Sequence, residues 1–384
     1  MSYESPWMDE ELGILRDSVA RFLERELVPH REAWEEQGYV DRSAWLKAGE
    51  AGLLCASIPQ AYGGGGGNVG HEAVIIQEIG RAGLGGGFGA GNGVSSCIVA
   101  HYILGYGTEA QKQRWLPPMA RGEVVGAIAM SEPGAGSDLQ GVSTTARKVD
   151  GGWVINGQKT WITNGQCADL IVVVAKTDPS AGAKGISLLA VEPAVAEGFK
   201  RGKRLSKLGM HAQDTSELFF DEVFVPGDNL LGGEPGRGFV QLMQQLAWER
   251  LQIALSATVA MESAVRLTVE YVGQRRLFGK SLAEFQNTQF KLAECKTRSV
   301  VARRFVDGLI VDLLAGKLDA DTAAMAKLWT TETQGQVIDE CLQLFGGFGY
   351  VTEYPIARLY ADARVTRIFG GTSEVMKLII SRTL

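Results

Sequence analysis

The chain has 384 residues, which predicts two or three domains at the usual size of about 150 residues each. Its composition, 45% hydrophobic and 21% charged, excludes wholesale disorder, and its net charge of −6 without a Lys/Arg-rich run argues against nucleic-acid binding. Five scattered cysteines and four isolated histidines predict neither a disulfide framework nor a metal site. The acidic N-terminus is unlike a signal or transit peptide, and no apolar run has the length of a membrane span, so we expect a cytoplasmic enzyme.

Residues 1–122 are expected to form an N-terminal α-helical domain. Apolar residues recur at helical spacing over 12–23 and 45–54. Glycine-rich stretches at 63–67 and 83–93 separate the predicted helices.

Gly65, Gly67 and Gly70 satisfy the G-x-G-x-x-G pattern of dinucleotide-binding folds. In those folds the pattern follows a strand and opens a helix, with an acidic residue about 20 positions further on. The segment before it contains Pro59 and Tyr62 and does not suggest such a strand. We therefore expect a flexible loop between two helices here.

Residues 123–232 contain β-branched runs separated by turn residues, which predicts a β-domain inserted between helical regions. The clearest runs are WVINGQKTWITNG, DLIVVVAK and GISLLAVE. Within the first of them, Asn156-Gly157 predicts a hairpin turn. Residues 216–226 predict a further pair of strands.

Helical periodicity returns in residues 233–384, and its segments have the length of bundle helices. The expected helices cover 238–275, 281–315, 319–345 and 372–382. The order helical, β, helical indicates an α+β protein of three domains.

One carboxylate lies on an apolar stripe of the first long helix. Steps of three and four residues place Glu249 on the face that the pattern predicts to be buried, together with Leu242, Leu246, Ile253, Ala257 and Ala260. A buried acid must be paired or neutralised. Glu249 is therefore either part of a structural ion pair, for which the adjacent Arg250 is poorly placed, or a functional group.

Five motifs follow one another along the chain: IAMSEPGAGSD at 128–138, WITNG at 161–165, QRRLFGK at 274–280, QLFGGFGY at 343–350 and GGTSE at 370–374. Together they resemble the acyl-CoA dehydrogenases, flavoproteins that introduce a 2,3-double bond into acyl-CoA thioesters. The resemblance covers essentially the whole chain. It implies the family's fold, with an N-terminal α-helical domain, a middle β-barrel-like domain and a C-terminal four-helix bundle. It also implies FAD as the cofactor and a homotetramer built as a dimer of dimers.

The resemblance implies two groups of flavin-binding residues. In the family, the first group lies against the flavin and covers its isoalloxazine ring; it matches Ile128, Met130, Ser131, Gly136, Ser137, Trp161, Ile162 and Thr163. The second group holds FAD across the dimer interface; it matches Arg275, Phe278, Gln286, Gln343, Leu344, Gly346, Gly347, Thr372 and Glu374. The positions that contact the acyl-CoA match Ser137, Arg250, Gly370 and Gly371.

The position of the catalytic base departs from many members of the family. They carry it as a glutamate immediately before Gly-Thr in the C-terminal motif, where this chain has Gly370. The long-chain and isovaleryl types carry it on the helix with Glu-Arg, which matches Glu249-Arg250. The resemblance and the apolar stripe therefore indicate the same carboxylate. The segments AQDTSELFFDEVFVP and VTEYPIARLYADARV also resemble the long-chain members in particular.

The resemblance implies that Glu249 removes the α-proton while the β-hydride passes to flavin N5, which gives trans-2-enoyl-CoA. A backbone N–H at or beside Gly370 would bind the thioester carbonyl, where enolate charge develops. An electron-transfer flavoprotein is the implied electron acceptor. We expect long or branched acyl chains as substrates, as in fatty acid β-oxidation. The small residues between 85 and 96 would serve either a deep acyl tunnel or close helix packing.

Two other functions stay open. One is a flavin monooxygenase or oxidase on the same fold, although Glu249 favours dehydrogenation. The other is a non-catalytic relative that binds flavin and another partner such as DNA. The cluster Arg298, Arg303 and Arg304, which such a partner would need, is more simply a solvated helix face.

Overall fold

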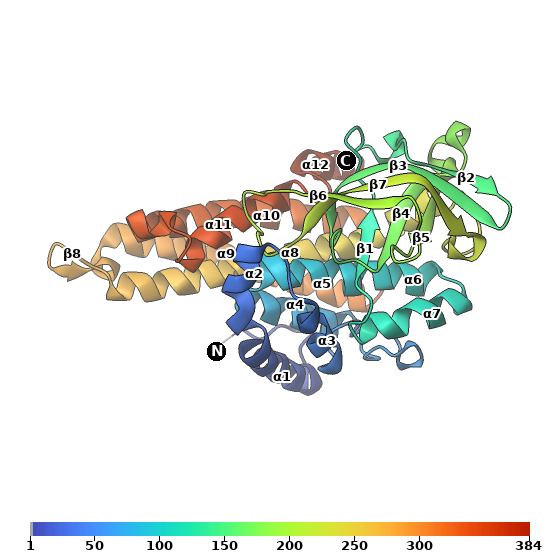
Figure 1. Cartoon of the computed structure of the whole chain (residues 1–384). Helices are drawn as coiled ribbons and strands as arrows, with labels where there is room; N and C mark the ends of the chain where they lie inside the picture. The colour runs from blue at the N-terminus through green and yellow to red at the C-terminus, as the bar shows by residue number, and fades with distance from the viewer. Residues whose placement is uncertain (1–2) are drawn as a thin grey trace.

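The computed structural model describes residues 3–384 and has three parts that follow one another along the chain (Figure 1). The N-terminal helices form the lower part of the view and a strand-rich part lies above them on the right. Long C-terminal helices run through the centre and continue to the left as an arm that ends near the label β8.

The first part is helical, as predicted. Its α-helices are α1 (Glu10–Glu26), α2 (Arg31–Gln37), α3 (Arg42–Glu50), α4 (Val69–Arg81), α5 (Ala90–Val94), α6 (Ala100–Tyr106) and α7 (Glu109–Ala120). The glycine run at 63–67 is a loop between a 3-10 turn and α4, with no strand before it, so the expectation of a loop between helices is confirmed. α4 begins after Asn68, whose side chain accepts a hydrogen bond from the N–H of Gly70 at 2.8 Å.

Two wide π-helical turns, Gly85–Gly89 and Ser95–Val99, lie on either side of α5. Glycine lets this segment pack closely against the middle of the chain. A Cβ atom on Gly87 would lie 2.7 Å from Cβ of Ala212, and one on Gly91 would lie 2.8 Å from Oδ1 of Asn164. At these positions the structure favours close packing as the reason for small residues; the acyl tunnel stays a prediction.

The middle part is a seven-stranded sheet in the order β1-β4-β2-β3-β7-β6, with β5 paired to β4. Its strands are β1 (Gly126–Ala129), β2 (Thr145–Val149), β3 (Gly152–Thr163), β4 (Leu170–Lys176), β5 (Ile186–Val191), β6 (Phe199–Arg204) and β7 (Thr215–Pro226). β1 runs parallel to β4, and β3 pairs along most of its length with the antiparallel β7. Alternate side chains of these strands form a buried core that includes Ile155, Val173 and Val223.

The predicted hairpin turn at Asn156-Gly157 is wrong. Both residues lie inside β3, at a bulge where the pairing with β7 shifts register. The turn between β2 and β3 is formed by Asp150-Gly151 instead, because Val149 pairs with Gly152. At the bulge, Asn156 accepts a hydrogen bond from the N–H of Glu222 on β7, and a Cβ on Gly157 would collide with Thr144. Asn-Gly therefore relieves crowding inside a long strand here, a role that local sequence does not distinguish from a turn.

The predicted pair of strands at 216–226 is also wrong. These residues form the single strand β7, which has β3 along one edge and β6 along the other. The segment contains no Gly or Asn at which the chain could reverse, and both of its edges already have partners.

The third part is a bundle of α8 (Gly238–Gln274), α9 (Gln286–Leu314), α10 (Ala320–Phe345), α11 (Pro355–Ala363) and α12 (Ser373–Ser381). At the end of the arm, the two-residue strands β8 (Arg276–Leu277) and β9 (Lys280–Ser281) form a hairpin between α8 and α9. α9 begins five residues later than predicted, because Ser281 and Glu284 form a capping box around a separate 3-10 turn. α11 was not expected.

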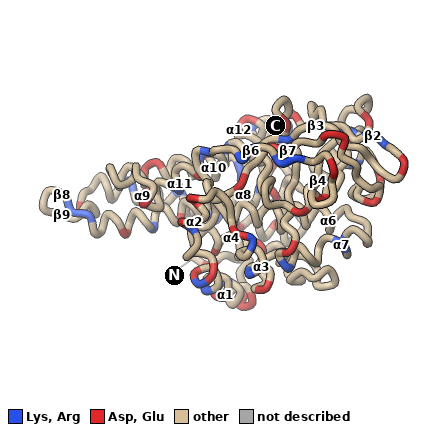
Figure 2. The backbone as a smooth tube through the Cα atoms, in the orientation of Figure 1, with Lys and Arg blue, Asp and Glu red and all other residues tan. Residues whose placement is uncertain are grey.

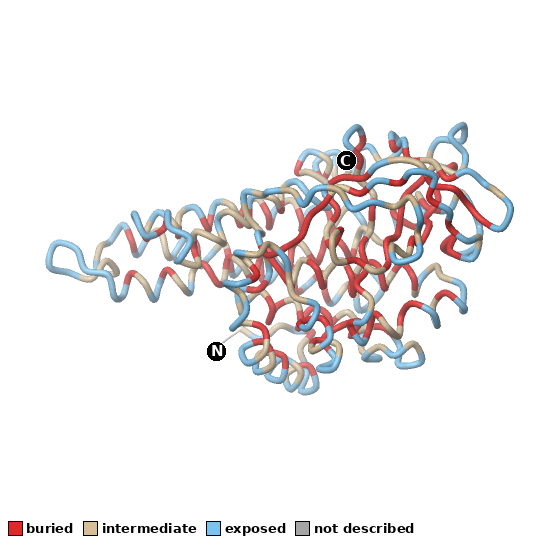
Figure 3. The backbone as a smooth tube through the Cα atoms, in the orientation of Figure 1, coloured by how far each residue is buried: buried red, intermediate tan, exposed pale blue. Residues whose placement is uncertain are grey.

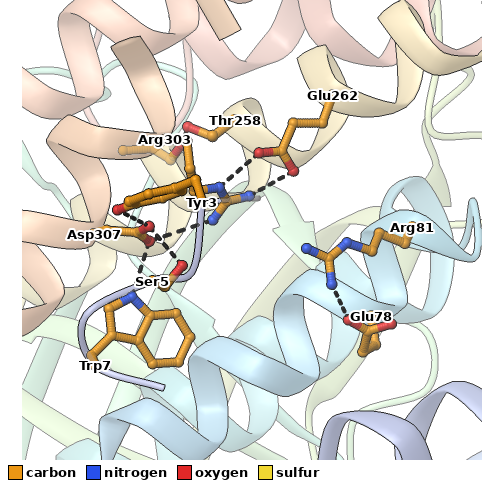
Figure 4. Close-up of polar contacts among 10 residues, drawn as sticks. Tyr3, Ser5, Trp7, Glu78, Arg81, Thr258, Glu262, Arg303 and Asp307 are labelled. Atoms are coloured by element: carbon orange, nitrogen blue, oxygen red, sulfur yellow. Dashed lines mark hydrogen bonds and ion pairs between the residues drawn. The ribbon is translucent and has the colours of Figure 1, made fainter. Parts of the chain in front are cut away.

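The N-terminal segment is fastened to the bundle through Asp307 of α9 (Figure 4). This fully buried carboxylate accepts hydrogen bonds from Tyr3 (2.8 Å), Ser5 (2.6 Å) and Trp7 (2.9 Å). Arg303, one turn before it, is buried against Glu262 of α8 with contacts of 2.7 and 2.8 Å. The expectation that the three arginines of α9 form a solvated face is therefore wrong for Arg303; Arg304 is exposed and lies 3.7 Å from the ring centre of Tyr3.

Buried residues line the faces along which the three parts meet, whereas the β8–β9 hairpin is exposed (Figure 3). Basic and acidic residues are interspersed along the chain, with Lys and Arg also at the end of the arm (Figure 2). Among the residues that the structure describes, no helix combines the length and apolar character that crossing a bilayer requires.

Candidate active site

Glu249 lies on α8 where this helix passes α4 and α6. The residue is 8% exposed, so the burial predicted from the apolar stripe is confirmed. Its Oε1 atom accepts a hydrogen bond of 3.0 Å from the hydroxyl of Tyr102 on α6. No cation of residues 3–384 lies within 4 Å of its carboxylate. A direct structural ion pair with Arg250 is therefore not formed.

The surroundings of Glu249 favour its neutral form. Burial raises the pKa of Glu249 to about 7, while the hydrogen bond from Tyr102 and the positive charges of Arg250 and His101 act in the opposite direction. Arg250 is itself buried, which lowers the pKa of its guanidinium, and its Nε–H has no hydrogen-bond acceptor in the described chain. A carboxyl that titrates near neutral pH in such a site is suited to proton transfer.

A second buried acid lies next to this site on α4. Glu72 accepts hydrogen bonds from the hydroxyl of Ser57 (2.5 Å) and from Nε2 of His101 (2.8 Å). Burial lowers the pKa of His101, but the carboxylates of Glu72 and Glu249 together raise it above its usual value. His101 precedes Tyr102 on α6, so a positive charge on its ring lies close to Glu249.

The C-terminal motif reaches α8 through Gly370. Gly370 packs against Ile253, one helical turn after Glu249, and both Gly370 and Gly371 have positive φ angles, of 62° and 92°. The carbonyl of Gly371 accepts a hydrogen bond of 2.6 Å from Lys327 of α10, which is completely buried. Burial lowers the pKa of Lys327 to about 8. The structure thus brings the predicted base and part of the predicted substrate-binding motif together.

The first group of predicted flavin residues gathers at the ends of β1 and β3. The carbonyl of Ser131 accepts a hydrogen bond of 3.0 Å from the N–H of Thr160, which joins the loop after β1 to the end of β3. Lys159 strengthens this junction with hydrogen bonds to the carbonyl of Met130 (3.0 Å) and to Glu132 (2.8 Å). Ile128 and Thr163 are partly buried and Ile162 is buried, whereas Gly136 and Ser137 are exposed on the loop.

The exposed surface of this junction fits a flat ring with a polar edge. Trp161 is 60% exposed between the buried residues Thr160 and Ile162, and its backbone has a positive φ of 58° that few non-glycine residues adopt. The partly buried Ser131, whose carbonyl binds the N–H of Thr160, and Thr163, two residues after Trp161, carry hydroxyls that can offer donors and acceptors at the edge of a ring. A heteroaromatic group such as the isoalloxazine of FAD matches this combination.

The second group of predicted flavin residues is divided. Arg275, Gln343, Leu344, Gly346 and Gly347 line a cleft of about 930 Å³ near the end of the arm. Phe278, 91% exposed, lies on the β8–β9 hairpin, and Gln286 is the first residue of α9. Thr372 and Glu374 are at the start of α12, which lies beside the sheet and far from the β8 end of the arm (Figure 1). Within one chain, the arm residues are therefore not brought to Trp161 or Glu249.

Sequence reasoning missed Tyr102, Lys159, Glu132 and Lys327. Glu132 lies inside the first motif and Lys159 two residues before the second, but their pairing depends on how β3 lies against the loop after β1. Lys327 interrupts an apolar stretch of α10, which was a usable signal. Nothing in the sequence near Tyr102 indicates its contact with a residue 147 positions away.

Three family models match the chain in order: the N-terminal, middle and C-terminal domains of acyl-CoA dehydrogenase, over residues 9–123, 127–223 and 236–384. The chain is 47% identical over 376 residues to the mitochondrial long-chain specific acyl-CoA dehydrogenase of Mus musculus, covering 97% of this chain and 86% of that protein. It is 39% identical over 385 residues to the mitochondrial isovaleryl-CoA dehydrogenase of Oryza sativa, covering 100% of this chain and 93% of that protein. The crystal structure of an acyl-CoA dehydrogenase from Geobacillus kaustophilus superposes with a TM-score of 0.95 at 47% identity, covering 99% of both chains. The chain belongs to the acyl-CoA dehydrogenase family, whose members are FAD-dependent flavoproteins.

Proposed function

We propose that this FAD-dependent acyl-CoA dehydrogenase acts on long or branched acyl chains and uses Glu249 as its α-proton base. The observation that carries the assignment of the base is the burial of Glu249 on α8 with no cation of residues 3–384 within 4 Å of its carboxylate. The higher identity to the long-chain dehydrogenase of mouse, 47% against 39% to the isovaleryl-CoA dehydrogenase of rice, favours long chains.

The residues around Glu249 suit it to remove a weakly acidic proton. Tyr102 holds Oε1, and Oε2 accepts no hydrogen bond from residues 3–384, so Oε2 is the atom available to the substrate. The raised pKa makes the ionised carboxylate a stronger base than a glutamate in water. We assign to a backbone N–H at or beside Gly370 the hydrogen bond to the thioester carbonyl, with Lys327 holding the adjacent carbonyl of Gly371. Arg250 lies next to the base and adds positive charge where the enolate develops.

FAD, when bound, supplies the acceptor for the β-hydride. We propose that Ser131 and Thr163 bind the polar edge of its ring system and that Trp161 covers the ring. Ile128, Met130, Gly136, Ser137 and Ile162 shape this site, with Ser137 and Gly371 also placed toward the acyl-CoA. Glu132 and Lys159 support it from within the sheet, through the contacts given above.

We further propose that the arm residues serve the flavin site of a second copy of the chain. Arg275, Phe278 and Gln286 belong to the β8–β9 hairpin and its flanks, at the end of the arm far from the sheet (Figure 1). Gly346 and Gly347 line the cleft beside Arg275. Arg275 can bind a pyrophosphate, and the glycines allow a close approach of the backbone. This arrangement supports a homotetramer built from pairs of dimers, with an electron-transfer flavoprotein as the acceptor of the electrons. The cytoplasmic location stays a prediction.

The test is anaerobic bleaching of the flavin of the purified protein by saturated acyl-CoAs of graded length and branching. Wild type is expected to bleach fastest with long chains, and Glu249→Gln to bind FAD and acyl-CoA but not to bleach. Glu270→Gln, an exposed glutamate on the same helix, is the matched control and should bleach as wild type does. Bleaching by Glu249→Gln at the wild-type rate would contradict the assignment of the base. A wild-type flavin that no acyl-CoA bleaches would contradict the dehydrogenase function itself.

A further inference from the structure

Tyr102 is the one described side chain that hydrogen-bonds to Glu249. It is completely buried on α6, inside a cluster of apolar residues that includes Ile103 and Leu242. Its ring also packs against that of Tyr106, with ring centres 6.0 Å apart. These contacts hold the ring independently of Glu249, so the hydroxyl is a fixed donor toward which the carboxylate must orient.

We propose that Tyr102 is the positioning residue of the base: its hydroxyl holds Oε1 of Glu249 and thereby turns Oε2 toward the α-carbon of the substrate. The inference rests on the proposed role of Glu249. A glutamate side chain has three rotatable bonds, and one fixed hydrogen bond to one oxygen removes most of that freedom. Orientation of this kind matters because proton abstraction requires contact geometry to within a few tenths of an ångström.

The donor is suited to this task in both charge states of the base. Burial raises the pKa of Tyr102 well above that of a free phenol, and the carboxylate of Glu249 raises it further, so the hydroxyl keeps its proton throughout the working pH range. Tyr102 therefore donates to the ionised carboxylate and stabilises it, which is the form that can accept the α-proton.

The other charged or titratable groups facing Glu249 act only through space. Arg250 is its neighbour on α8, His101 and Tyr106 lie on α6, and Glu72 of α4 reaches the site through its hydrogen bond to His101. From α10, Lys327 lies near Arg250 rather than near the carboxylate. None of these groups forms a hydrogen bond with Glu249 in residues 3–384, so the direct contact is that of Tyr102.

Tyr102→Phe tests the inference with a pH profile. The variant keeps the ring and removes the donor. Losing a hydrogen bond to an ionised carboxylate raises the pKa of that carboxylate by about one unit. The rate of flavin bleaching at saturating acyl-CoA is expected to rise with pH, and the midpoint of this rise is expected about one pH unit higher in Tyr102→Phe than in wild type. Below the wild-type midpoint, the variant is therefore expected to bleach roughly tenfold more slowly. Above both midpoints, any rate that is still lost measures the effect of the orientation of the carboxylate.

Tyr106→Phe is the matched control. Its hydroxyl lies on the same helix, four residues later, and donates to the carbonyl of Gln241 or to Gln244 rather than to Glu249. The pH midpoint of Tyr106→Phe is expected at the wild-type value. An unchanged midpoint in Tyr102→Phe, or equal shifts in the two variants, would overturn the inference.

A second variant covers the outcome in which Tyr102→Phe fails to fold or to bind FAD. Replacement of Tyr102 by 3-fluorotyrosine retains the packing and strengthens the donor, so the midpoint is expected to move to lower pH; an upward shift or none would overturn the inference. Glu249→Gln separates the two hypotheses. If it still bleaches, the proposed base is wrong, whereas if it does not bleach and the profiles of the Tyr102 variants match wild type, only the role of Tyr102 is wrong.

Discussion

Lys159 and Glu132 form an ion pair inside the sheet domain, with Nζ and Oε1 2.8 Å apart and both side chains almost completely buried. Burial alone would raise the pKa of Glu132, but hydrogen bonds from Lys159, Ser143 and Thr144 lower it to about 2. Burial lowers the pKa of Lys159 to about 8. The pair joins the loop of the first motif to the strand that carries the second.

Lys159→Met is expected to weaken FAD binding and to destabilise the fold. It leaves the carboxylate of Glu132 buried without its cation, a change that costs on the order of 3 kcal/mol. The measurements are the dissociation constant of FAD by fluorescence titration and the free energy of unfolding by denaturant. The exposed Lys200→Met on β6 should change neither. Unchanged FAD affinity in Lys159→Met would show that the pair does not position the flavin segments.

The same pair gives the protein an acid-sensitive element. The pKa of Glu132 falls from 4.5 to about 2 on folding, so the stabilisation is complete above pH 4.5 and is lost as the pH falls from there toward 2. Wild type should therefore lose more stability than Glu132→Gln over this window. Parallel denaturation curves at a series of pH values would show this, and identical pH dependence in the two proteins would contradict it.

Glu249→Gln is expected to be more stable than wild type at pH 8. Folding raises the pKa of Glu249 from 4.5 to about 7, so the ionised side chain opposes folding as the pH rises through this range and has no effect below it. The difference in the free energy of unfolding between Glu249→Gln and wild type is on the order of 3 kcal/mol above pH 7 and should vanish near pH 4. Thermal denaturation at both pH values measures it. A destabilised Glu249→Gln at pH 8 would mean that this carboxylate has a structural role.

Lys327→Met is expected to slow dehydrogenation while FAD remains bound. The variant removes the hydrogen bond to the carbonyl of Gly371. The backbone of Gly370 and Gly371 then gains conformational freedom, because glycine has no side chain that restricts it. Because the contact supports the segment that we propose to bind the thioester, we expect a loss of about tenfold or more in the bleaching rate at saturating acyl-CoA. Lys317→Met, exposed just after α9, is the control. A wild-type rate in Lys327→Met would exclude the lysine from the site.

Asp307→Asn is expected to lower the free energy of unfolding by about 2–4 kcal/mol. The change removes the charge that accepts hydrogen bonds from Tyr3, Ser5 and Trp7. It also breaks the ion pair of Asp307 with Arg303 (3.6 Å), which leaves Arg303 paired with Glu262 alone. Chemical denaturation gives the size of the effect, and Asp339→Asn on an exposed face of α10 should leave stability within about 0.5 kcal/mol of wild type. Equal stability of the two variants would show that the N-terminal segment is not fastened by this carboxylate.

Periodicity and motif order in the sequence were enough to determine the succession of helical, β and helical parts and the burial of Glu249. Each of these properties is local: a step of three or four residues shows which face of a helix is apolar wherever that helix comes to lie. The same reasoning failed at Asn156-Gly157, because a turn and a bulge use the same residues and differ only in whether the partner strand continues past them.

Only the tertiary structure decided which groups meet. Tyr102 reaches Glu249 across 147 residues, Lys159 pairs with Glu132, and Lys327 finds the carbonyl of Gly371, all because elements distant in sequence pack together. The structure also divided the predicted flavin residues between the sheet and the end of the arm. A sequence pattern describes one helix or strand at a time, whereas a contact depends on how two of them pack. Because many partners are compatible with the same buried face, the pattern does not show which partner packs against it.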